Sequence, residues 1–147
     1  MAKSQPDFTI TVSRNRRRFV VLSHKDAAFK KGQVAAQQMS GSTVAFVAVG
    51  ASKPEFSFAV VDGDEAVRLD AFVTNPRTGK PYTDVTISWV GRRAGETVAH
   101  KFEECCAGEG GSVKTTEGEG FTSDGNFKFL MVRALRTING AAPSRVA

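Results

Sequence analysis

Hydrophobic and polar residues alternate in several short stretches of the chain, and this period of two is typical of a half-buried β-strand. The clearest stretch is residues 55–60, where Phe56, Phe58 and Val60 alternate with polar or small residues. Similar patterns predict further strands at residues 8–12, 18–23, 43–49, 84–90, 97–106 and 126–138, with a short extended piece at 112–116. The first two of these strands form a predicted hairpin with a basic tip. The chain is therefore expected to be mainly β.

The alternation stops at Asp62, where a helical pattern begins. The apolar residues that follow share one stripe of a short helix, and they are Ala66, Val67, Leu69, Ala71 and Phe72. Asp62 is the predicted N-cap, and Glu65 stands where a carboxylate can reach back to the cap residue. Asp64 adds negative charge to the first turn, where the helix dipole favours it. One short helix is expected directly after the clearest strand.

The expected fold class is an antiparallel β-barrel or two packed sheets, with one short α-helix and a long extended loop. That loop is residues 24–41, in which Gly32 interrupts a weak apolar stripe and which has room for one helical turn. A loop of this length in a compact domain is usually functional or a binding arm. A single domain is expected over residues 1–147, with flexible termini at 1–7 and 140–147 and a flexible Gly-rich loop at 107–125.

The predicted last strand is apolar on both faces. Phe127, Phe129, Met131 and Leu135 lie on one face, and Leu130, Val132, Ala134 and Ile138 lie on the other. Antiparallel sheets usually keep one face in water. Either the single helix covers the second face, or a neighbouring subunit does, since large exposed apolar patches mark interaction surfaces. The candidate subunit-interface residues are Phe29, Val34, Met39, Phe46, Leu130, Val132, Ala134 and Ile138.

Composition adds three expectations. Eleven Phe against one Trp and one Tyr indicate packing more than ligand recognition. The formal net charge of +5 permits contact with nucleic acid or another anionic partner. No apolar run approaches the length of a membrane span, and residues 1–6 contain no apolar core of a secretory signal. Two adjacent Cys do not make a disulfide framework, so synthesis in a reducing, intracellular compartment is expected.

Candidate chemistry is sparse. Cys105 and Cys106 are adjacent on a predicted strand, so their thiols point to opposite faces, and only His24 and His100 could join them at a metal. A nucleophilic cysteine with His100 as its base is the weaker alternative to one buried and one surface cysteine. The Gly-rich residues 108–115 lack the Gly that a phosphate-binding loop places before its Lys-Thr pair. We therefore expect no catalytic, cofactor or metal site, and no enzyme.

A basic cluster offers a different possibility. Its members are Arg14, Arg16, Arg17, Arg18, Lys30, Lys31, Arg92 and Arg93. Clustered Arg and Lys bind phosphates without sequence preference, and such binding depends on salt. A basic β-barrel that binds single-stranded nucleic acid is therefore one alternative function.

The order of these features resembles the tail tube proteins of tailed bacteriophages and the related tube protein of type VI secretion. The resemblance covers residues 8–138. It begins with the hairpin and the long arm, which are followed by the strand P-E-F-S-F-A-V-V-D-G-D-E-A-V that enters the helix. The strand D-V-T-I-S-W-V, the Gly-rich loop and the closing strand F-K-F-L-M-V-R-A-L complete it. It rests on element order and size, without a short diagnostic motif. The chain departs from the family in being basic, whereas such tubes often have an acidic lumen.

The resemblance implies a structural virion protein that self-assembles into hexameric rings, which stack into the tail tube through which DNA passes during ejection. The long arm would then reach an adjacent ring. Implied partners are further copies of the chain, the tail sheath, tape-measure and baseplate proteins, and genomic DNA in transit without specific binding. The implied location is the virion tail, after synthesis in the host cytoplasm. Another virion part, such as a baseplate tube-initiator or a head-tail connector, is the alternative within this class.

Overall fold

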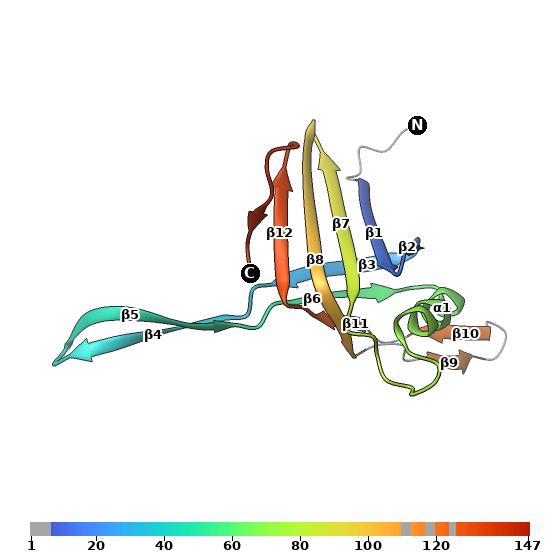
Figure 1. The fold of residues 1–147 in the computed structure, drawn as a ribbon, viewed down its shortest axis with the longest axis horizontal. Coiled ribbons are helices and arrows are strands. Elements are labelled where there is room, and N and C mark those ends of the chain that lie inside the picture. Colours follow the sequence, from blue (N-terminus) through green and yellow to red (C-terminus); the bar gives the residue numbers. More distant parts are fainter. Residues whose placement is uncertain (1–6, 110–112, 117–119, 124–125) are drawn as a thin grey trace.

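The computed structural model describes residues 7–109, 113–116, 120–123 and 126–147 (Figure 1). Two crossing layers of antiparallel strands form the body, with the helix at one end and a hairpin projecting from the other. The elements are β1 (Asp7–Arg14), β2 (Arg17–Val21), β3 (His24–Lys30), β4 (Gln33–Ser40), β5 (Thr43–Ser52), β6 (Glu55–Val60), α1 (Gly63–Val73), β7 (Val85–Arg93), β8 (Glu96–Glu109), β9 (Val113–Thr116), β10 (Gly120–Ser123), β11 (Asn126–Leu130), β12 (Arg133–Ile138) and β13 (Ser144–Arg145). The mainly β fold with one short helix is as predicted.

The long strand β8 belongs to both layers. In the first layer the strand order is β2-β1-β7-β8-β12, and in the second it is β8-β11-β6-β3. The partner of β8 changes from β12 to β11 near Glu104, whose φ of 53° marks an irregularity in the strand. Strands that bend at such irregularities make the corners of orthogonally packed sheets. Of the two expected architectures, the described strands therefore form packed layers and do not close into a barrel.

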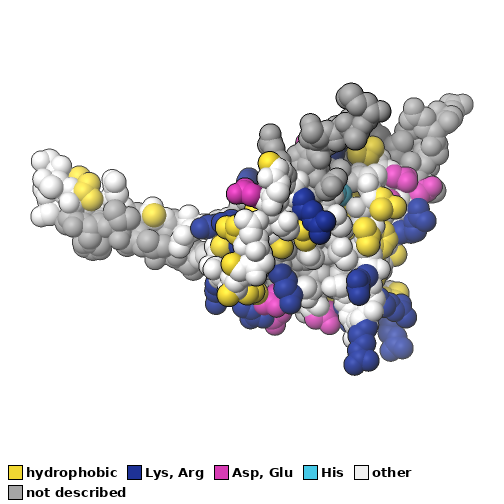
Figure 2. Space-filling view, turned by 90° about the horizontal axis from the view of Figure 1, so that it is seen from above, with side chains coloured by type: hydrophobic (Ala, Val, Ile, Leu, Met, Phe, Trp, Pro, Cys, Tyr) yellow, Lys and Arg dark blue, Asp and Glu magenta, His cyan; other side chains and the backbone are white. Residues whose placement is uncertain are grey.

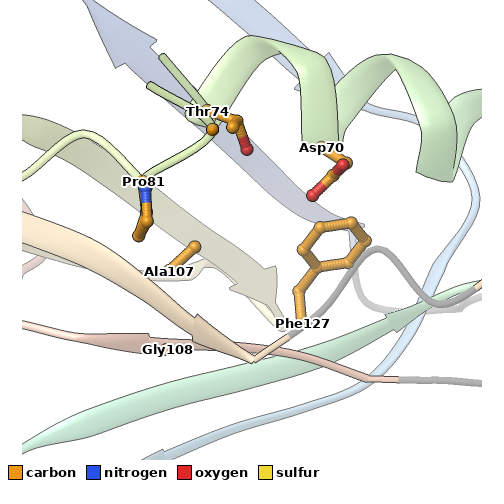
Figure 3. A pocket seen from close by; sticks show the side chains of 7 residues that line it. Asp70, Thr74, Pro81, Ala107, Gly108 and Phe127 are labelled. Carbon is orange, nitrogen blue, oxygen red and sulfur yellow. The ribbon is translucent and has the colours of Figure 1, made fainter. Parts of the chain in front are cut away.

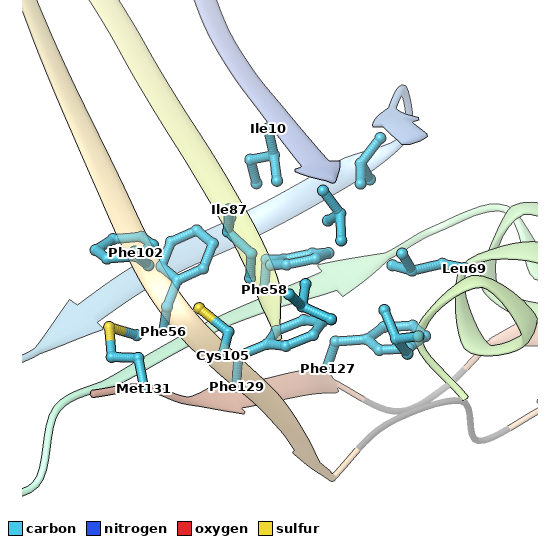
Figure 4. Packing of buried hydrophobic residues seen from close by; sticks show 14 of the residues in the cluster. Ile10, Phe56, Phe58, Leu69, Ile87, Phe102, Cys105, Phe127, Phe129 and Met131 are labelled. Atoms are coloured by element: carbon cyan, nitrogen blue, oxygen red, sulfur yellow. The ribbon is translucent and has the colours of Figure 1, made fainter. Parts of the chain in front are cut away.

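The core between the layers is built largely from phenylalanine (Figure 4). Phe56, Phe58, Phe102, Phe127 and Phe129 are completely buried, and the ring centroids of Phe56 and Phe102 are 4.8 Å apart. Tilted and offset ring pairs of this kind add to the free energy of burial. The abundance of Phe is explained by this packing, and the alternation predicted for β6 is confirmed.

The predicted last strand, residues 126–138, is two strands. β11 ends at Leu130 and pairs with β6 and β8, whereas β12 begins at Arg133 and lies in the other layer. Because Met131 and Val132 carry the chain across, the side-chain alternation changes phase between the two strands. Ala134 is consequently fully buried, opposite Phe102, although the sequence pattern placed it on the outer face.

The helix begins as predicted, because the backbone N–H of Asp64 donates to the carboxylate of Asp62 at 3.0 Å. The prediction for Glu65 is wrong. Its carboxylate is buried and accepts hydrogen bonds from the backbone N–H of Leu22, the backbone N–H of Ser23 and the hydroxyl of Ser23. The N–H of Asp62 donates to the Ser23 hydroxyl instead. Glu65 therefore fastens the β2–β3 corner to the helix.

The helical stripe is also narrower than predicted. The apolar residues that α1 buries are Ala66, Leu69 and Val73, whereas Val67 and Ala71 are exposed. Phe72 is half-buried and packs on Phe19 of β2.

Three other expectations need correction. Residues 24–41 contain two strands and no helical turn, because β3 joins the second layer and β4 forms a hairpin with β5. Within residues 140–147, which were expected to be flexible, residues 144–147 lie along β12. The Gly-rich region contains two short strands, β9 and β10, in place of one extended piece. The strands predicted at 8–12, 18–23 and 84–90 are present with bounds shifted by a few residues.

Candidate assembly surfaces

The hairpin of β4 and β5 is the most distinctive surface, and we call residues 33–52 the arm. The arm pairs with no other strand in the described part of the chain and projects from the body (Figure 1). It contains no Asp, Glu, Lys, Arg or His, although charged residues make up 24% of the whole chain. In the space-filling view, the Lys, Arg, Asp and Glu side chains lie on the body and none lies along the arm (Figure 2). An isolated two-stranded hairpin is marginally stable in water, and an uncharged edge is open to pairing with another chain.

The direction of the arm is set at its base, where its two strands meet the body. Gly32 has a φ of +61°, and a Cβ atom at this residue would lie only 2.1 Å from the carbonyl oxygen of Lys53. The N–H of Lys53 donates to the carbonyl of Gly32 at 3.2 Å, and the hydroxyl of Ser52 donates to the carbonyl of Lys31 at 2.9 Å. Only glycine satisfies both the conformation and the close approach.

The edges of the two layers are unequal. β2 pairs only with β1 and ends the first layer, and β3 pairs only with β6 and ends the second, so each of these two strands has a free outer side among the described strands. At the other end of the first layer, the outer side of β12 is covered by β13. Free edges of this kind are sites for strand addition by a partner.

The predicted interface residues fall in three places. Met39 lies near the tip of the arm and is 56% exposed, while the side chains of Val34 and Phe46 lie outside the described residues. Leu130 and Val132 are about half exposed at the crossing between β11 and β12. Neither the helix nor any other described element covers these two residues.

The remaining predicted residues behave differently from one another. Ile138 is 51% exposed at the end of β12. Phe29 is half-buried, with its ring stacked 5.1 Å from Phe102, so it belongs mainly to the core of the single chain. Ala134 is completely buried and has no surface with which to contact a neighbour.

Sequence reasoning missed a second apolar patch, at the β2–β3 corner. Leu22 is 83% exposed, Val61 is 56% exposed and Val20 is 46% exposed. The N–H of Val61 donates to the carbonyl of Ser23 at 2.8 Å, which brings Val61 beside the corner. The available signal was the spacing of Val20 and Leu22, which places both on one face of an extended run.

The cysteines and His100 do not form a reactive pair. Burial raises the pKa of the Cys105 thiol to about 12, so it is not ionised near neutral pH. Cys106 is half-buried on the same strand, six residues from His100, a separation of roughly 20 Å at about 3.3 Å per residue. His100 is held by packing instead, since its ring stacks 5.1 Å from Trp89 and its Nε2 atom accepts from Arg136 at 3.1 Å. Burial, and then the nearby Arg136 charge, lower the pKa of His100.

The described residues of the body line pockets. One of about 200 Å³ lies between α1, the loop that follows it and the ends of β8 and β11, and Asp70 is the ionisable residue among its described lining residues (Figure 3). Another, of about 320 Å³, is lined by Phe8, His24, Lys25, Asp26, Ala27 and Trp89. Within the described residues, no cluster of three His, Cys, Asp or Glu side chains could hold a metal ion. No convergent set of catalytic groups is visible in either pocket.

The basic cluster is divided by the fold. Arg14 is engaged, because its guanidinium donates to Asp84 at 2.7 Å and lies 3.4 Å from the ring centroid of Tyr82. Arg16, Arg17 and Arg18 are exposed at the β1–β2 turn. Lys30 and Lys31 are exposed near the base of the arm, Arg92 is exposed in β7, and the side chain of Arg93 lies outside the described residues. The positive charges therefore do not form one continuous surface with the aromatic residues, which are mostly in the core.

Comparison with known proteins gives no relative: no family model matches the chain, and no curated protein or solved structure is significantly similar to it. No helix in the described part of the chain has the length and apolar character of a membrane span.

Proposed function

We propose that this chain is a structural subunit that assembles with further copies into stacked hexameric rings, forming a tail tube for the passage of DNA. The observation that carries the proposal is the arm: a charge-free hairpin that the body of its own chain leaves uncovered. An arm of this composition gains free energy only when a partner covers it, because burial of apolar surface contributes about 25 cal/mol per Å². Further copies of the chain are the partner that the resemblance to tail tube proteins implies.

The sheet edges support the same proposal. The free outer side of β2 lies at one end of the first layer, and β12 lies at the other end. A contact between two different edges is head-to-tail, and head-to-tail contacts close into rings when the rotation between copies allows. In this proposal the edges join copies within a ring, and the arm joins one ring to the next.

The exposed apolar residues are consistent with contacts between copies. Leu130 and Val132, together with Leu22 and Val61 at the β2–β3 corner, are large side chains left in water by the single chain. In the assembled tube neighbouring copies would cover them. No catalytic step, cofactor or metal is part of the proposal, and DNA passes without being bound specifically.

Negative-stain electron microscopy of the purified protein tests the proposal, with Met39→Glu as the informative variant. The full chain is expected to form rings or tubes as its concentration rises. Met39→Glu places a charge on the arm and should raise the concentration needed for tubes at least tenfold. Thr83→Glu is the matched control, because Thr83 is exposed in the loop between α1 and β7. A monomer at every concentration, or equal loss of tubes in both variants, would count against the proposal.

One observation favours a second function, which is binding of single-stranded nucleic acid. Arg16, Arg17 and Arg18 are exposed together at a hairpin tip. Such binding should weaken steeply with salt. Absence of any mobility shift with an oligonucleotide at about 50 mM salt, where the phosphate attraction is still strong, would exclude it. A tube-initiator or connector would assemble into single rings without growing into tubes, and its copy number per virion would be correspondingly small.

A further inference from the structure

The outer edge of β12 is occupied by the last residues of the sequence. The N–H of Val146 donates to the carbonyl of Ala134 at 2.8 Å, and the N–H of Ala134 donates to the carbonyl of Ala147 at 2.9 Å. Further along, Leu135 lies opposite Arg145 and Arg136 lies opposite Ser144. The segment Ser144–Ala147, which we call the tail strand, thereby satisfies backbone groups that an uncovered edge would leave unpaired.

The tail strand is held by few contacts. Its ladder with β12 contains only two residue pairs, whereas the pairing of β12 with β8 contains six. Ser144 and Arg145 are exposed, and only Val146 and Ala147 pack against the edge of the core. The residues that lead into it are Gly140, Ala141, Ala142 and Pro143, which supply almost no side-chain contact area. A longer strand with apolar side chains would pair with this edge more strongly.

The surroundings of β12 remain open with the tail strand in place. Val132 is 55% exposed just before β12, and Ile138 is 51% exposed at its end. A strand laid along the whole of β12 would contact both residues, but the short tail strand covers neither. At the other end of the same layer, β2 is a strand of 5 residues with a free outer side among the described strands.

We propose that the tail strand is an intramolecular placeholder, which keeps the edge of β12 closed until the free β2 edge of a second copy displaces it. This inference rests on the proposed function and adds a control over assembly. In the single chain the β12 edge is paired internally, so it is closed to the β2 edge of another copy. Assembly exchanges a two-residue ladder for a longer one and brings Val132 and Ile138 into contact with the neighbour.

A reversible crosslink tests the exchange directly. Leu135 and Arg145 are opposite each other, and the hydrogen bonds at Ala134 and Val146 make theirs a non-hydrogen-bonded position, with a typical Cα separation of about 4.5 Å. That separation lies within the range of a disulfide. The variant carries Leu135→Cys, Arg145→Cys and Cys106→Ser, and the control carries Arg145→Cys and Cys106→Ser alone. Assembly is followed by light scattering and electron microscopy, with and without dithiothreitol.

The oxidised crosslink should raise the critical concentration for assembly at least tenfold, and dithiothreitol should restore it. A chain that ends at Gly140 should show the opposite effect, with a critical concentration roughly tenfold lower, equivalent to about 1.4 kcal/mol per copy. Equal assembly of the oxidised and reduced crosslinked protein would overturn the placeholder while leaving the proposed function intact. Failure of the unmodified, control and shortened chains to assemble under any condition would overturn the proposed function and the placeholder with it.

Discussion

Replacing Glu65 by Gln tests how the fold fastens the β2–β3 corner to the helix. The Glu65 carboxylate is 7% exposed and accepts three hydrogen bonds, at 2.9 Å from the N–H of Leu22, 2.9 Å from the N–H of Ser23 and 2.8 Å from the Ser23 hydroxyl. All three partners are donors. A glutamine side chain has one acceptor oxygen and one NH₂ group, so it cannot accept at both ends.

The expected loss of stability is worked out for the more favourable of the two orientations of the glutamine amide. Its oxygen can keep both Ser23 donors, but its NH₂ group then faces the N–H of Leu22, which loses its acceptor. A hydrogen bond to a charged group contributes about 1.5–3 kcal/mol, and a donor left unpaired costs about 1–3 kcal/mol. We expect the free energy of unfolding to fall by about 3 kcal/mol. For a chain of this size, this corresponds to a loss of roughly 10 °C in melting temperature.

Thermal and urea unfolding, followed by circular dichroism on the unassembled chain, measure this loss. Asp70→Asn is the matched control, because Asp70 is an exposed carboxylate on the same helix. Its replacement should change the free energy of unfolding by less than about 0.5 kcal/mol. A loss below about 1 kcal/mol for Glu65→Gln, or equal losses for the two variants, would refute the assigned role of Glu65.

Three other predictions follow from single residues. Gly32→Ala should abolish tube formation in electron micrographs, because Gly32 combines a positive φ with a close approach to Lys53, whereas Gly41→Ala near the arm tip, with a positive φ but open space, should reduce it far less; equal effects would contradict a fixed arm base. Thiol labelling of the folded chain at pH 8 should modify Cys106 and spare Cys105, whose pKa burial raises to about 12, until the chain unfolds; rapid labelling of both would show that Cys105 is accessible. Because the pKa of His100 is lowered in the folded state, protonation favours the unfolded chain, so the free energy of unfolding should decrease as pH falls below about 6.5; His100→Gln should remove that part of the slope, and an unchanged pH profile would refute the assignment.

Local sequence patterns predicted those parts of the fold that depend only on residues close together in the sequence. The alternation in residues 55–60, the basic hairpin and the Asp62 cap all depend on neighbours in sequence, and the structure contains each of them. Glu65 was misread because the sequence offers a local partner, whereas the folded chain brings three donors from the β2–β3 corner, more than forty residues away in sequence.

Long-range topology decided the rest. The change of phase between β11 and β12 exists because β8 is shared by two layers, so the strand on its outer side must break where the layer changes. The arm gave no alternating signal in Q-V-A-A-Q-Q-M, and among the described strands β4 pairs only with β5 and belongs to neither layer of the body. The exposure of Met39, Leu130, Val132 and Ile138 could be predicted from the sequence pattern. The patch around Leu22 could not, because it also depends on the position of Val61 in the folded chain.

The molar mass of the purified chain as a function of its concentration tests the central claim most directly. Multi-angle light scattering, with electron microscopy of the same samples, should detect ring-sized species and then tubes as the concentration rises, because the arm and the exposed apolar residues become buried only between copies. A single species with the mass of one chain, 15.8 kDa, persisting at high concentration and without tubes, would contradict the claim.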